Sequence, residues 1–162
     1  MSKAPCAEAE AKVHAELPAS VLYILRCEGL AVAVLTAILY ARSGASWWLF
    51  AALWLAPDLS LLGYFAGPSL GARIYNSVHA YATPITLAVC ALLVGAHALV
   101  PIALIWGNHI AVDRLLGFGL KYPAGFGWTH LGRVGRAQAT PKLASPAQPR
   151  AAAHEGSATR QG

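Results

Sequence analysis

Apolar residues in this chain gather in four long blocks, separated by short turns that contain glycine, proline or serine. A helix needs about 20 mostly apolar residues to cross a bilayer, because the hydrocarbon core is about 30 Å thick and each residue adds about 1.5 Å. The blocks reach this length, and they are too long and too uniformly apolar for the strands of a membrane barrel. They predict transmembrane helices at about 21–40, 46–66, 72–94 and 96–120.

The pattern therefore predicts an all-α fold, an integral membrane bundle of four transmembrane helices that occupies residues 21–133. Residues 1–20 are polar and mixed in charge, and we expect them to form a separate N-terminal segment. Residues 134–162 are rich in Ala, Pro, Gln and Arg and lack an apolar face, so we expect a disordered basic tail. Lys and Arg in this tail place it in the cytoplasm by the positive-inside rule, and four spans return the N-terminus to the same side.

The composition supports a membrane protein and argues against a soluble domain, a nucleic-acid-binding protein and a disulfide-rich protein. Only 12% of the 162 residues are charged, against about 25% in soluble domains. The net charge of +5 is explained by the orientation of the chain, so we expect membrane lipids as partners and no nucleic acid. The three cysteines have no CxxC spacing, which argues against a disulfide framework or a thiolate metal site.

Several ionisable side chains lie inside the apolar blocks, where a charge is costly and function is the default interpretation. Counted from the cytoplasmic end, one lies seven or eight residues inside each predicted helix: Glu28, Asp58, His79 and Asp113. At about 1.5 Å per residue, all four lie about 10–12 Å below the inner surface. Four antiparallel helices can bring such a layer to the centre of the bundle.

Further polar residues extend this layer. His109 precedes Asp113 by four residues, so both lie on one helix face. Asn76, Asn108 and Arg114 lie at neighbouring positions of the third and fourth helices and complete the predicted polar layer. The alternative is a purely structural role, in which these groups hydrogen-bond between helices and fix their register.

Two prolines adjoin the layer. Pro57 precedes Asp58 directly, and Pro84 lies five residues after His79. A proline inside a membrane helix frees a carbonyl one turn earlier, which is tolerated when polar neighbours satisfy it. We therefore expect kinks in the second and third helices, beside the polar layer.

Two histidines and a carboxylate suit zinc or a similar divalent metal. The first hypothesis is thus a metal site with His79, His109 and Asp113 as ligands and with Asp58 or Glu28 as a further ligand or general base. If the protein is an enzyme, this site predicts a metal-dependent intramembrane hydrolase. One alternative is a small cation- or proton-coupled transporter or channel component, for which we expect a homo-oligomer. Two others are a bis-histidine haem protein and a membrane scaffold subunit with a structural polar core.

Four runs of the sequence resemble a family of bacterial integral membrane proteins, domain of unknown function 4260. The runs are APDLSLLGY (56–64), YNSVHAYATP (75–84), HIAVDRLLGFGLKYPAGF (109–126) and THLGR (129–133). The resemblance covers about residues 22–133 and implies a compact four-helix protein of the bacterial cell membrane, without adding a mechanism. Its characteristic positions here are Asp58, Tyr75, Asn76, His79, His109, Asp113, Arg114 and Lys121.

Overall fold

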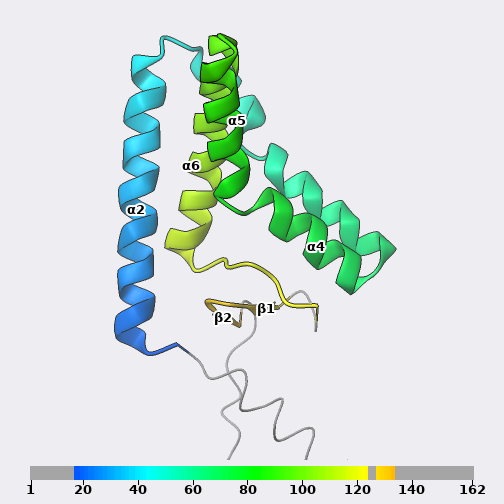
Figure 1. Cartoon of the computed structure of the whole chain (residues 1–162). Helices are drawn as coiled ribbons and strands as arrows, with labels where there is room; N and C mark the ends of the chain where they lie inside the picture. The colour runs from blue at the N-terminus through cyan, green and yellow to red at the C-terminus, as the bar shows by residue number, and fades with distance from the viewer. Residues whose placement is uncertain (1–16, 124–126, 134–162) are drawn as a thin grey trace, which may run out of the picture.

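The computed structural model describes residues 17–123 and 127–133. The expected basic tail, 134–162, and most of the N-terminal segment, 1–20, lie outside this part of the chain. The described residues are almost entirely helical and end in a small pair of strands (Figure 1). In chain order the elements are α2 (Ala19–Arg42), α3 (Trp47–Leu53), η1 (Ala56–Ala66), α4 (Pro68–Val78), α5 (Ala82–Leu93), η2 (His97–Leu99), α6 (Val100–Leu116), β1 (Trp128–Thr129) and β2 (Gly132–Arg133).

Three helical segments of the described chain are long and apolar enough to cross a membrane: Ala19–Arg42, Trp47–Ala66 and His97–Leu116. A fourth span results if α4 and α5 count as one helix with a 42° bend. The predicted helical architecture is thus confirmed, with three helices, or four when the bent pair is counted as one span, that are long and apolar enough to cross a membrane. The cytoplasmic position of both ends remains a prediction.

The main packing contact joins α2 to α6 along their length, with α5 on the other side of α6 (Figure 1). Gly29 allows the close approach of α2, because a Cβ there would lie 2.8 Å from the backbone nitrogen of Leu115. Elsewhere α2 exposes large apolar side chains, among them Tyr23, Ile24 and Leu35. A helix that is apolar on all sides but buries only one is typical of a lipid-facing span.

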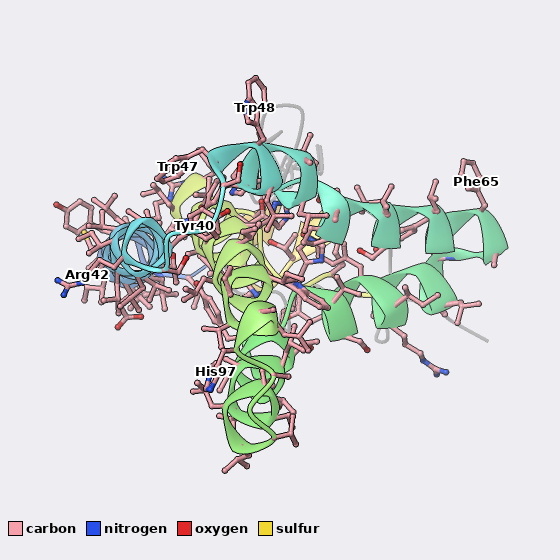
Figure 2. The ribbon with its side chains drawn as sticks, turned by 90° about the horizontal axis from the view of Figure 1, so that it is seen from above. Tyr40, Arg42, Trp47, Trp48, Phe65 and His97 are labelled. Carbon is pink, nitrogen blue, oxygen red and sulfur yellow. The ribbon has the colours of Figure 1, made fainter. Side chains whose placement is uncertain are left out.

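The second predicted helix is interrupted between α3 and η1, and η1 is a 3-10 helix of 11 residues. Pro57 lies in its first turn, where a missing N–H is harmless. Because a 3-10 helix has three residues per turn, every third side chain lies on one face. Leu59, Leu62 and Phe65 accordingly form an exposed apolar stripe, with Phe65 at the far end of the arm that η1 and α4 extend sideways (Figure 2).

The third predicted helix begins at Pro68 rather than residue 72 and breaks at residues 79–81. The break frees carbonyl groups of the last turn of α4, and side chains satisfy them. Thr83 Oγ1 donates to the Ser77 carbonyl, Trp106 Nε1 to the Val78 carbonyl at 2.9 Å, and Arg114 to the His79 carbonyl at 3.0 Å. The expected change in the third helix is therefore present as a break with a 42° bend, and the second helix changes from α to 3-10 at residues 54–55.

The fourth helix, predicted to extend to about residue 120, ends four residues earlier, at Leu116. Gly117 stops it, because its φ of 94° is in the left-handed region that favours glycine. The chain then crosses beneath the helices, where Lys121 pairs with Thr129 and β1 pairs antiparallel with β2 (Figure 1).

Candidate metal centre

Four ionisable side chains from three parts of the chain meet at one point. η1 supplies Asp58, the break between α4 and α5 supplies His79, and α6 supplies His109 and Asp113 one turn apart. Each offers one ligand atom, and the four atoms all lie within 4.8 Å of one another. The two interruptions thus help to place two of the four groups, since Asp58 is the third residue of η1 and His79 lies in the break between α4 and α5.

The distances match the donor spacing around a small cation. The Nε2 atoms of His79 and His109 are 3.3 Å apart, and each lies 3.5 Å from Asp58 Oδ1. Asp113 Oδ2 lies 3.6 Å from His79 Nε2 and 3.8 Å from His109 Nε2. Bonds of about 2.0–2.1 Å to an ion at the centre of a tetrahedron place neighbouring donor atoms about 3.3–3.4 Å apart. The five distances that involve a histidine are therefore close to those of a slightly expanded tetrahedral site, and the two carboxylate oxygens lie within 4.8 Å of each other.

Direct ion pairs explain these distances less well. A charge-assisted N–H···O hydrogen bond has its heavy atoms about 2.7–2.9 Å apart, whereas the four His–Asp separations are 3.5–3.8 Å. Converging nitrogen and oxygen lone pairs repel one another unless a cation lies between them. The arrangement also leaves no room for a porphyrin between the imidazoles, so it does not fit bis-histidine haem ligation.

Burial divides the four groups into an inner and an outer part. The side chains of His79 and His109 are 1% and 2% exposed, that of Asp113 is 16% exposed, and that of Asp58 is 39% exposed. The site is therefore closed around the imidazoles and open at Asp58.

Tyr75 supports the inner part of the site. Its carbonyl lies 3.1 Å from His79 Nδ1, so an Nδ1–H tautomer donates there and leaves Nε2 to bind a metal. The tyrosine ring stacks on the imidazole with centroids 3.8 Å apart, and its hydroxyl lies 3.4 Å from Asp113 Oδ2. Tyr75 comes one turn before His79, so its position four residues upstream was a usable signal in the sequence.

The surroundings of His109 are more apolar. Trp54 packs edge-on against the ring, with centroids 5.2 Å apart. His109 Nδ1 is buried and makes no hydrogen bond within the described part of the chain. Nothing in the sequence pattern pointed to Trp54, because its contact depends on the break that follows α3.

Two basic residues lie close to the site. Arg114 donates to the carbonyls of His79 and Phe118, at 3.0 Å and 2.8 Å. Lys121 is 4% exposed, and its Nζ lies 5.1 Å from the centroid of the Tyr75 ring. Burial lowers the pKa of Lys121, while the negative charges of Asp113 and Asp58 act in the opposite direction. The net charge around the four groups thus depends on these two cations as well as on the carboxylates.

Asn76 and Asn108 lie near the centre and have positioning contacts. Asn76 accepts from the backbone N–H of Lys121 at 2.7 Å and donates to its carbonyl at 2.8 Å, which fixes the segment after α6. Asn108 accepts from Trp54 Nε1 at 3.0 Å and donates to the Ala33 carbonyl at 2.8 Å. The two amides therefore connect the elements that carry the site, and they are not among its four converging groups.

Glu28 is not part of this cluster in the described structure. It lies on α2 beside Arg114, Tyr81 and His130, around a separate cavity of about 370 Å³. Gly29 is the residue that faces α6, and the next residue on a helix points about 100° away. Of the predicted layer, Asp58, His79 and Asp113 come together, and His109 joins them.

Comparison with known proteins gives one result. No curated protein and no solved structure matches the chain. The profile of one family, described as "Domain of unknown function (DUF4260)", matches residues 22–134, which include all four converging residues. The chain belongs to this family, as the four sequence runs indicated.

Proposed function

We propose that the protein is a divalent-metal-dependent hydrolase whose site lies inside the membrane. The observation that supports this is the spacing of the four donor atoms, 3.3–3.8 Å for the five pairs that include a histidine. Imidazole and carboxylate ligands together suit zinc, which favours a tetrahedral arrangement of this size. A divalent ion held there polarises a carbonyl or phosphoryl oxygen and lowers the pKa of a bound water to about 7.

The exposed fractions assign the roles. His79, His109 and Asp113 are the buried groups, and we assign them as the ligands that hold the ion. Asp58 is the most exposed of the four groups, and we assign it as the base that takes the proton of a water molecule, with the water and not Asp58 as the fourth ligand. In hydrolysis the hydroxyl of water adds to the carbonyl carbon or phosphorus, the ester bond to the leaving oxygen breaks, and that oxygen takes up the proton.

The test is metal content and hydrolysis measured on the same detergent-purified samples. The wild type should hold about one divalent ion per chain, and Asp113→Asn should lose it. Asp58→Asn should keep the ion and lose hydrolysis of ester and phosphoester substrates. His97→Asn is the matched control, because His97 is an exposed histidine in η2, about three helical turns before His109 (Figure 2).

Two results would contradict the proposal. A wild-type sample that takes up no zinc, manganese, iron or cobalt would remove the metal. The second result is a protein that binds metal and carries cations across liposome membranes but cleaves no ester or phosphoester. If Asp58→Asn abolished that cation flux, the transporter alternative would be favoured.

A further inference from the structure

Arg114 joins two parts of the chain that carry the converging groups. It lies on α6, next to Asp113, and its side chain is partly buried. Nη1 donates to the Phe118 carbonyl at 2.8 Å, and Nη2 donates to the His79 carbonyl at 3.0 Å. A planar guanidinium holds its donors in a fixed fork, so the direction of one bond determines the direction of the other. One side chain therefore connects the break between α4 and α5 to the end of α6.

The bond to Phe118 fixes the guanidinium relative to α6. The N–H of Phe118 donates to the Asp113 carbonyl at 2.7 Å, where Gly117 ends the helix in a left-handed conformation. The Phe118 carbonyl is thereby held against the last turn of α6, and Arg114 reaches it from that same turn. The other half of the fork is then directed at His79 from the helix that carries two of the four converging groups.

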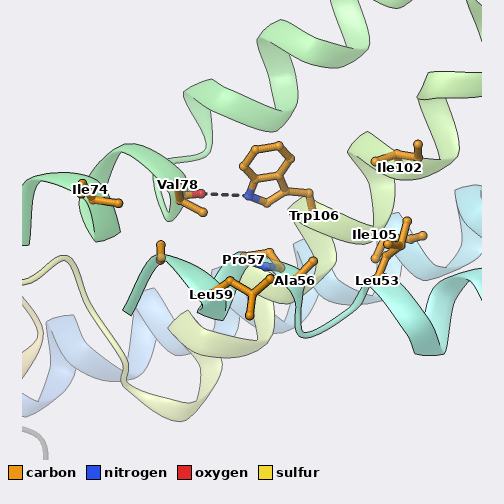
Figure 3. Close-up of a pocket in the computed structure, with 10 residues that line it drawn as sticks. Leu53, Ala56, Pro57, Leu59, Ile74, Val78, Ile102, Ile105 and Trp106 are labelled. Carbon is orange, nitrogen blue, oxygen red and sulfur yellow. Dashed lines mark hydrogen bonds between the residues drawn. The ribbon is translucent and has the colours of Figure 1, made fainter. Parts of the chain in front are cut away.

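His79 depends on such a contact because it lies where α4 ends. Its N–H donates to the Tyr75 carbonyl at 2.8 Å, but its own carbonyl lies in the break and lacks the partner that a continuing helix supplies. Arg114 replaces that partner. Trp106, also on α6, does the same for the Val78 carbonyl at 2.9 Å (Figure 3). These two donors from α6 therefore act on His79 and on the residue directly before it.

A small displacement of His79 changes the geometry of the site. Its Nε2 lies 3.3 Å from that of His109 and 3.5 Å from Asp58 Oδ1, distances close to those around a bound ion. The carbonyl and the imidazole belong to one residue, so a shift of the peptide group moves the ligand atom with it. Groups that orient a metal ligand typically contribute about 10–100-fold to metal affinity.

We propose that Arg114 is a positioning residue, which holds His79 where its imidazole can bind the metal. The inference rests on the proposed function for the metal, but the hold on the backbone can be measured without one. The effect of charge has the opposite sign, because a guanidinium close to the site repels a divalent ion. Glu28 lines the cavity beside Arg114, so loss of the guanidinium also leaves a carboxylate that attracts cations. Charge alone therefore predicts tighter metal binding after loss of Arg114, whereas positioning predicts weaker binding.

The experiment measures zinc affinity by competition with a chelator, on detergent-purified wild type, Arg114→Lys and Arg114→Gln. Arg114→Lys keeps the charge but lacks the fork, and it should bind zinc about 10–100-fold more weakly. Arg114→Gln should also bind zinc more weakly, although it has lost a positive charge. Cobalt(II) in place of zinc should give a changed visible absorption spectrum in both variants, because that spectrum reports ligand geometry. Arg73→Gln is the matched control: Arg73 is an exposed arginine of α4, and its loss should leave affinity and spectrum unchanged.

Hydrogen exchange of the metal-free protein gives the separate measurement. Backbone amides at residues 79–85 should exchange faster in both Arg114 variants than in the wild type, because the break loses a contact with α6. Zinc affinity that is unchanged or higher in the two variants, or unchanged exchange at these amides, would overturn the inference. A wild type that binds no metal, together with faster exchange in the variants, would reject the metal site and retain the hold of Arg114 on His79.

Discussion

Removing the metal should destabilise the folded protein, and the structure gives the size of the effect. Without a cation, the carboxylate oxygens of Asp58 and Asp113 lie within 4.8 Å of each other. At an effective dielectric constant of about 20, two such charges repel by about 3.5 kcal/mol, and the partial exposure of Asp58 reduces this further. A bound ion removes the repulsion and adds its own binding energy.

The expected gain on metal binding follows from mass action. A ligand at about 100 to 1,000 times its Kd stabilises the folded state by about 2.7–4.1 kcal/mol. For a chain of this length, each kcal/mol raises the Tm by about 2–4 °C. Treatment with EDTA should therefore lower the Tm by about 5–16 °C, and zinc should restore it.

The assay is thermal unfolding in detergent, followed by circular dichroism, before and after chelation and after zinc addition. His97→Asn should behave as the wild type does, whereas His79→Asn combined with His109→Asn should show no response to EDTA or zinc. A wild-type Tm that changes with neither EDTA nor zinc would refute the reasoning. An equal response in the double variant would place the metal elsewhere.

Four further predictions concern the scaffold. Gly29→Ala should destabilise the protein by about 1–3 kcal/mol in denaturant unfolding, because its Cβ would lie 2.8 Å from the Leu115 backbone nitrogen. Gly107→Ala, whose nearest contact is 3.7 Å away, should stabilise it by about 0.5–1 kcal/mol, and equal effects would contradict the packing argument. Asn108→Leu should cost about 1–3 kcal/mol in the same experiment by leaving buried partners unpaired, yet retain metal. Burial lowers the pKa of His130, so its contribution to stability is complete above about 6.5 and declines as the pH falls; imidazole NMR shifts should give a titration midpoint below that value.

The position of the site could be predicted from depth along the helices. Helix rise is fixed, so counting from one membrane face placed Asp58, His79 and Asp113 at one level before any packing was known. The i,i+4 spacing then added His109 to the face of α6 that carries Asp113. The same count also placed Glu28 in this layer, and the structure does not bring it to the cluster, so depth along the helices alone does not decide which groups meet.

The rotation of α2 could not be predicted in the same way. Apolar residues surround this helix, so the sequence has no polar face that fixes which side turns inward. The close contact at Gly29 decides it, and Glu28 lies beside Arg114 and His130 instead of joining the other acids. That contact depends on the shape of the α6 surface, and the sequence of α2 carries no information about this surface.

The breaks in the second and third helices were only partly predictable. Pro57 and Pro84 indicated where the backbone would change direction. The conversion of residues 56–66 to a 3-10 helix and the complete break at residues 79–81 depend on tertiary contacts, including those from Trp106 and Arg114 to the freed carbonyls. These long-range contacts are what hold His79 at the centre.

X-ray absorption on the zinc-loaded protein tests the central claim most directly. The account predicts two imidazole nitrogens at about 2.0–2.1 Å and carboxylate oxygens at about 2.0–2.2 Å. His79→Asn and His109→Asn should each remove one imidazole contribution. A spectrum without imidazole scattering, or with sulfur ligands at about 2.3 Å, would contradict the account.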